Sequence, residues 1–110
     1  MRLLAIGMVF LIAGCRDRAQ PFTLYRNSNV DASMRIYFAT FDANESAGDY
    51  NMTNCEMAAR LLNANIHALA KANQRPDPAS LGFWCEPGQF KATGRVPLNF
   101  GAKFPTDVGD

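Results

Sequence analysis

The sequence predicts a small α+β domain with the element order strand, strand, helix, strand. Two observations carry this prediction. Residues 22–26 and 34–41 alternate apolar and β-branched side chains as a hairpin does, and an apolar stripe beginning at Met52 recurs in the three- and four-residue steps of an amphipathic helix. A short aromatic run at 81–86 follows as a third strand. We therefore expect one helix packed on a three- or four-stranded sheet, with one disulfide.

The strongest strand pattern lies in residues 34–41, where apolar side chains occupy both faces of the expected strand. The even-numbered positions, from Met34 to Thr40, form one face and the odd-numbered positions form the other, because successive side chains of a strand point to opposite sides. Strands that are buried on both faces have nearly continuous apolar sequences. This segment is therefore expected to be a central strand, joined to the first strand by a turn at residues 27–33.

The helix is predicted to begin near Thr53. Thr53 and Glu56 have the spacing of a capping box, in which the Thr side chain bonds an amide of the first turn and the Glu side chain reaches back. Asn63 and Asn65 are mediocre helix formers, so a break is possible there. The apolar stripe comprises Met52, Cys55, Ala59, Leu62, Ile66 and Leu69. A stripe of this kind is typical of a core face, so Cys55 is expected to be buried.

The N-terminal stretch has the layout of a secretory signal. Arg2 supplies a positive charge, Leu3–Ala13 is an apolar run, and two small residues precede Cys15. At a helical rise of about 1.5 Å per residue this run covers roughly 17 Å, about half of a bilayer core, so a permanent transmembrane helix is not expected. An ordinary signal peptide with an incidental cysteine and a short buried helix are the alternatives.

The motif Ile12-Ala13-Gly14-Cys15 resembles the lipobox of bacterial lipoproteins, with Ile12 in the place that Leu usually holds. The resemblance implies cleavage before Cys15 and acylation of its sulfur and of its new amino group. Membrane lipid is thus an expected partner, because several acyl chains together hold a protein stably on a membrane. Arg16 follows the cysteine where Asp would resemble an inner-membrane retention signal, so the implied location is the outer membrane, with the domain facing the periplasm.

With Cys15 assigned to lipid, Cys55 and Cys85 remain as a pair in an exported chain, where disulfides form and persist. Their bond closes a loop of about thirty residues and is expected to stabilise the domain by roughly 3.5 kcal/mol. It also brings the end of the second strand close to the end of the third. We therefore expect these two strands to run parallel, connected by the helix. Unpaired thiols, or half of a metal site, are the alternatives.

Composition divides the chain into four segments. Residues 1–14 are the expected lipoprotein signal peptide, and the polar residues 15–21 form a tether. Residues 22–91 contain the predicted elements and form the domain. Residues 92–110, rich in Gly, Pro and isolated aromatic side chains, are expected to be loosely ordered or disordered.

Five short segments are similar to those of small uncharacterised bacterial lipoproteins. They are Thr23–Ser28, Ala39–Ala43, Tyr50–Asn51, Asn54–Cys55 and Trp84–Gly88. The resemblance spans residues 22–90 and supports these domain limits. It brings no activity to this chain.

No group of residues in the sequence predicts catalysis. His67 is the single histidine, and no orienting acid can be assigned to it. The motifs of phosphate loops, zinc proteases and serine hydrolases are missing. The loop acids Asp42, Glu45 and Asp49 lack the alternate spacing of a calcium loop, so we interpret them as solvated. We therefore expect no enzyme activity, no cofactor and no metal.

Removal of Arg2 with the signal leaves ten basic against ten acidic side chains, a balance that disfavours a nucleic-acid partner. Arg26 and Arg35 flank the hairpin turn and are interpreted as ordinary surface residues. The sequence thus favours a lipid-anchored, non-enzymatic envelope protein with a structural or protein-interaction role, whose partner is an unknown envelope protein or the cell wall. The alternative is a periplasmic module that binds a small ligand or an ion through the hairpin and the acidic loop.

Overall fold

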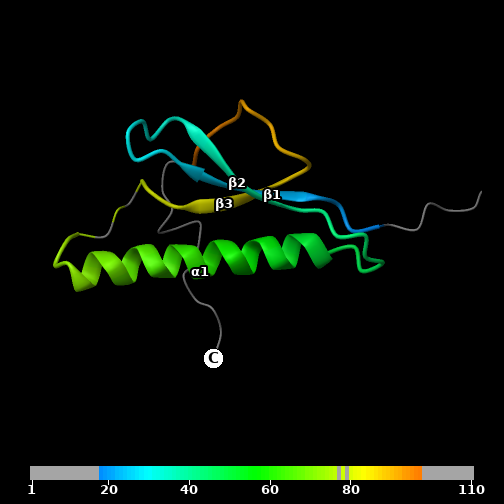
Figure 1. The fold of residues 1–110 in the computed structure, drawn as a ribbon, viewed down its shortest axis with the longest axis horizontal. Coiled ribbons are helices and arrows are strands. Elements are labelled where there is room, and N and C mark those ends of the chain that lie inside the picture. Colours follow the sequence, from blue (N-terminus) through cyan, green and yellow to red (C-terminus); the bar gives the residue numbers. More distant parts are fainter. Residues whose placement is uncertain (1–17, 77, 79, 98–110) are drawn as a thin grey trace, which may run out of the picture.

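The computed structural model describes residues 18–76, 78 and 80–97. Its elements are β1 (Phe22–Asn27), β2 (Arg35–Phe41), α1 (Tyr50–Ala72) and β3 (Phe83–Pro87), which is the predicted class and order (Figure 1). The expected signal peptide lies outside the described residues, as does Cys15. Within the described part of the chain, no helix combines the length and the apolar character that crossing a membrane requires.

β1 is the middle strand of a three-stranded sheet with the order β2-β1-β3, and it pairs antiparallel with both neighbours. β2 and β3 therefore run parallel to each other, connected by α1, as predicted. The prediction that residues 34–41 form a central strand is wrong, because β2 is an edge strand. Apolar side chains on both faces of a segment do not by themselves mean burial, and those of β2 are largely exposed.

A β-bulge at Phe38 disturbs the predicted alternation of β2. Leu24 pairs with Ala39 and the next residue of β1 pairs with Tyr37, which leaves Phe38 as the extra residue. Its ring meets the ring of Phe83 edge to face, with centroids 5.1 Å apart. Ala39 packs against the same core under α1. Even and odd positions therefore do not divide cleanly between the two faces of β2.

α1 begins at Tyr50, earlier than the capping box predicts, and Thr53 lies inside its first turn. The residue before the helix, Asp49, makes no side-chain capping bond. The early start accompanies the burial of Asn51, whose side chain accepts a hydrogen bond from the N–H of Ala43 and donates one to its C=O, both at 3.0 Å. This amide ties the first turn to the loop after β2, which the capping pattern does not reveal.

α1 also continues without a break through Asn63 and Asn65. Asn63 is buried, and its amide donates to the C=O of Phe83 at 3.1 Å and accepts from the N–H of Phe83 at 2.8 Å. A poor helix former costs less than about 0.7 kcal/mol, and two buried hydrogen bonds outweigh that cost. Tertiary contact therefore decides the course of the helix here.

The two faces of the sheet have different covers (Figure 1). α1 packs on one face over a core of Leu24, Cys55, Ala59 and Phe83. On the other face Tyr25 and Trp84 stack with centroids 5.8 Å apart, and Val96 packs against them. Residues 89–91 do not form a fourth strand. Of the segment expected to be loosely ordered, residues 92–97 follow this outer face, and the remainder lies outside the described residues.

Candidate functional site

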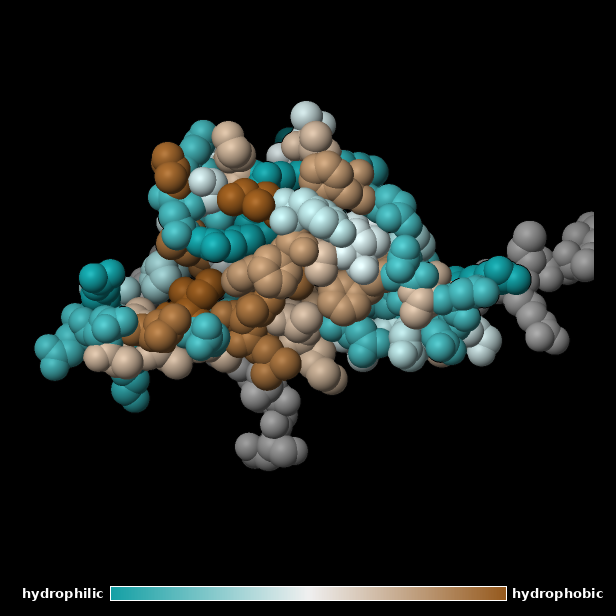
Figure 2. All heavy atoms as spheres, in the orientation of Figure 1, coloured by the Kyte–Doolittle hydropathy of each residue, from teal (hydrophilic) through white to brown (hydrophobic). Residues whose placement is uncertain are grey.

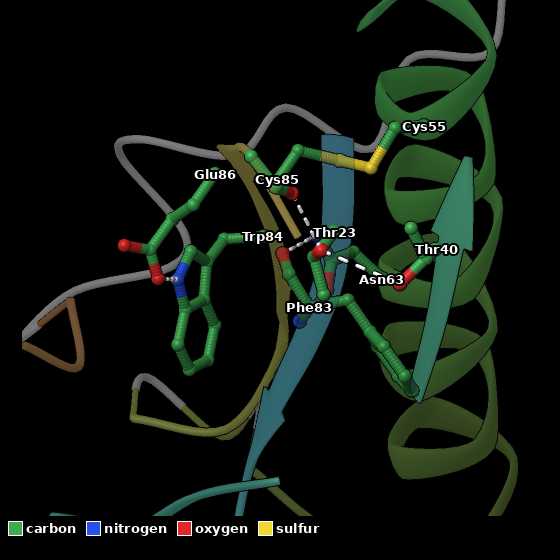
Figure 3. Close-up of a disulfide and its surroundings, with 9 residues drawn as sticks. Thr23, Thr40, Cys55, Asn63, Phe83, Trp84, Cys85 and Glu86 are labelled. Atoms are coloured by element: carbon green, nitrogen blue, oxygen red, sulfur yellow. Dashed lines mark hydrogen bonds between the residues drawn. A yellow bond between two sulfur atoms is a disulfide. The ribbon is translucent and has the colours of Figure 1, made fainter. Parts of the chain in front are cut away.

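The predicted disulfide is confirmed and joins α1 to β3 (Figure 3). The Cα atoms of Cys55 and Cys85 are 6.2 Å apart, within the usual range of about 4.4–6.8 Å. Cys55 is fully buried and belongs to the core under the helix. Its sulfur is therefore not available as a nucleophile or a metal ligand, and the disulfide has a structural role.

The outer edge of β3 is covered at Phe83 by a side chain of α1. Asn63 binds both the N–H and the C=O of Phe83, so a helix side chain occupies the place where a further strand would pair. Beyond the end of β3, the N–H of Gly88 donates to the C=O of Pro21 at 2.7 Å, and its own C=O accepts from the hydroxyl of Thr23 at 2.8 Å. Asn63 therefore covers the outer edge of β3 at Phe83, and the bonds of Gly88 hold the end of β3 to the β1 side of the sheet.

The outer edge of β2 is open. β2 is the terminal strand of the sheet on this side, and within residues 18–97 as described no side chain bonds the backbone of residues 36–41. Ile36, Tyr37 and Phe38 are 43%, 47% and 52% exposed, and no charged residue lies between Arg35 and Asp42. We call these three residues the β2 edge surface. Proteins usually protect such an edge with charges, prolines or a bulge, and β2 carries the bulge alone.

Arg35 is buried, so its interpretation as a surface residue is wrong. Its guanidinium pairs with the carboxylate of Glu86 at 2.6 Å and donates to the backbone carbonyls of Lys91 and Thr93. It also lies over the ring of Tyr25, with its central carbon 4.2 Å from the ring centroid. Arg35 thus holds the segment after β3 against the outer face. A strand pattern cannot reveal such a role, because all its partners are distant in sequence.

A groove with a volume of about 560 Å³ lies between the C-terminal half of α1 and the segment leading into β3. Figure 2 shows hydrophobic residues gathered over this half of α1 and the adjoining part of the sheet. The lining includes Arg26 and Arg75, and Arg26 donates to the side-chain oxygen of Asn29. Sequence patterns miss the groove, because its residues come from separate segments of the chain.

The remaining candidates do not assemble into a site. In the described ranges, no three His, Cys, Asp or Glu side chains are placed to hold a metal ion, the acidic loop included. His67 lines a separate pocket together with Lys71 and Arg75 on the last turns of α1 and just beyond it. No protein-family model, curated protein or solved structure matches the chain. Inference about function therefore depends on the motif at Cys15 and on the surfaces described above.

Proposed function

We propose that this chain is a lipid-anchored protein of the bacterial envelope, without a catalytic role, whose domain docks a protein partner along the β2 edge surface. The lipobox-like motif that ends at Cys15 supports the anchor. The disulfide supports an oxidising compartment, since such bonds persist in exported proteins and are rare in the cytosol. One observation carries the docking role: residues 36–41 of β2 are uncharged and form an open edge, whereas Asn63 covers the outer edge of β3 at Phe83.

An open edge strand can bind a partner by accepting an additional strand. The partner's backbone then pairs with the free N–H and C=O groups, and exposed side chains contact it on both faces of the sheet. Ile36, Tyr37 and Phe38 supply such side chains. Because the edge carries no charge, affinity would come from apolar burial and backbone pairing, and it would depend little on salt.

The proposed tether is short, which restricts where the partner lies. Ala19 is buried, and its N–H donates to the C=O of Glu45 at 3.0 Å, so the ordered domain already begins there. Four residues of extended chain reach at most about 14 Å, so acylated Cys15 would keep the loop around Glu45 close to the membrane. The partner would accordingly be a protein at the membrane surface.

The anchor is tested by metabolic labelling with a fatty-acid analogue. The parent chain should incorporate the label, whereas Cys15→Ser should remain unlabelled and uncleaved. The matched variant Arg16→Ser leaves the sulfur in place and should label like the parent. Labelling of Cys15→Ser to the parental level would refute lipid attachment at this residue.

Docking is tested by placing a photo-crosslinking amino acid at position 36 or 38 of the anchored protein in its native envelope. Position 57 is the control, because Met57 is similarly exposed, at 55%, but lies on α1. We expect one discrete adduct from the two β2 positions and none from position 57. The adduct should disappear when Tyr37→Lys adds a charge to the edge. Identical adducts from all three positions, or none from β2, would contradict the proposal.

A further inference from the structure

The groove beside α1 has an apolar lining of a size that suits a small molecule. Its volume of about 560 Å³ falls within the range of about 300–1,000 Å³ that is typical of ligand pockets. Buried Phe83 forms part of it, and α1 contributes half-buried side chains. The apolar residues of the lining are Leu62, Ile66, Leu69, Ala70, Pro76, Pro78, Leu81 and Phe83. An extended hydrocarbon chain would find carbon contacts along most of this surface.

The charged residues of the described lining are both positive. They are Arg26 and Arg75, and the described lining contains no carboxylate. The single ion pair in the described part of the chain joins Arg35 to Glu86, so neither groove arginine forms an ion pair with another described residue. Lys71 lies beside Arg75 at the neighbouring pocket and adds a further positive charge.

The C-terminal end of α1 would normally oppose an anion, because its free carbonyls carry partial negative charge. Here three of the last four carbonyls of α1 accept hydrogen bonds. The C=O of Leu69 accepts from the backbone and the side chain of Asn73, that of Ala70 accepts from the N–H of Arg75, and that of Lys71 accepts from the N–H of Gln74. The positive side chains therefore determine the local preference for charge.

From these observations we infer that the groove binds a single-chain anionic amphiphile, namely a free long-chain carboxylate. Its hydrocarbon chain lies along Leu62, Ile66 and Leu69, and its carboxylate meets the guanidinium groups of Arg26 and Arg75. Arginine suits this head group, since its planar fork donates two parallel hydrogen bonds to a carboxylate. The site is distinct from the β2 edge surface, and binding there does not depend on a docked protein.

The test uses the chain that cleavage before Cys15 leaves, with Cys15→Ser to keep it free of lipid and with its disulfide intact. Amide chemical shifts are followed during titration with dodecanoate below its micelle concentration, and dodecyltrimethylammonium serves as the cationic probe of equal chain length. We expect saturable shifts at Ile66, Leu69 and Leu81 with dodecanoate, and at least tenfold weaker binding of the cation. Affinity should rise about twofold to fourfold per methylene from decanoate to dodecanoate.

Matched surface variants test the site without endangering the fold. Arg75→Ala should weaken dodecanoate binding about tenfold, because a charge-assisted hydrogen bond is lost, whereas Arg60→Ala, on α1 away from the groove, should not. Leu69→Asn should weaken binding, whereas Leu61→Asn should not, although the two leucines are 54% and 52% exposed.

Three results would overturn the inference. The first is the absence of saturable shifts below the micelle concentration. The second is equal affinity for the carboxylate and the cation, which would remove the role of the arginines. The third is an equal effect of Leu69→Asn and Leu61→Asn, which would move binding away from the groove.

Discussion

β3 and β2 are the two edge strands of one sheet, and they differ in how their outer backbone groups are bonded. On β3, Asn63 bonds both backbone groups of Phe83, and the disulfide fixes Cys85 to the helix. On β2, Ile36 and Phe38 are exposed beside backbone groups that no side chain of the described residues covers. Since a free edge invites pairing with another chain, a partner that adds a strand has one side of the sheet to approach. The difference separates an edge that stabilises the fold from an edge that is available for binding.

Removing the disulfide should give the largest effect, because it releases β3 from α1. The double variant Cys55→Ala with Cys85→Ala is expected to lose roughly 3.5 kcal/mol of unfolding free energy, the value for a loop of about thirty residues. Urea unfolding of the lipid-free chain measures this loss, with Cys15→Ser as the reference that retains the bond. An unchanged urea midpoint in the double variant would show that the bond contributes nothing to the fastening of β3.

Removing the side-chain amide of Asn63 should give the second-largest loss of unfolding free energy. Asn63→Ala leaves the N–H and C=O of Phe83 buried without partners, which costs about 2–3 kcal/mol. Asn65→Ala is the matched control on the same helix. Because Asn65 is exposed, the free energy of unfolding of this variant, measured in urea, should stay within about 0.5 kcal/mol of the parent value. If the two variants lost equal unfolding free energy, the loss would come from replacing an asparagine in the helix and not from the hydrogen bonds between Asn63 and Phe83.

A charge on β2 should separate binding from stability. Phe38→Lys removes a half-exposed ring and its contact with Phe83, so the loss of unfolding free energy should be about 1 kcal/mol or less. The same variant should abolish crosslinking from position 36. Met57→Lys adds an equal charge on α1 and should leave both measurements unchanged. If Phe38→Lys lost as much unfolding free energy as Asn63→Ala, Phe38 would be needed for the stability of the fold, which would contradict the assignment of the β2 edge to binding.

The turn that leads into β2 should respond to acid, with the smallest effect of the series. The hydroxyl and the N–H of Ser33 bond the carboxylate of Asp31 and hold its pKa below the ordinary value of 3.8. A lowered pKa in the folded state favours the turn above pH 3.8, and this contribution disappears as the pH falls through the folded value. A carbon-detected titration of Asp31 should give a pKa below 3.8, and Ser33→Ala should raise it. A pKa above 3.8 in the parent would contradict these bonds.

The elements and the disulfide were predictable from local and pairwise signals. The helix stripe indicated burial of Cys55, and the even pair of cysteines implied that β2 and β3 run parallel. These inferences succeed because helical periodicity and disulfide geometry leave few alternatives.

The surfaces were not predictable in the same way. The apolar residues of β2 suggested a central strand, because a sequence pattern cannot distinguish side chains that become buried in the fold from side chains that stay exposed on an edge strand. The roles of Asn63 and Arg35 depend on backbone groups of Phe83, Lys91 and Thr93, which lie twenty or more residues away. Such contacts exist only after the chain has folded.

Hydrogen exchange of the lipid-free monomer tests the difference between the two edges most directly. The amide of Phe83 donates to Asn63, so we expect it to exchange only through global unfolding. The β2 amides that face away from β1 should exchange at least about 100-fold faster, because local fluctuation suffices to expose them. Equal protection of Phe83 and of these β2 amides in the monomer would contradict an open β2 edge.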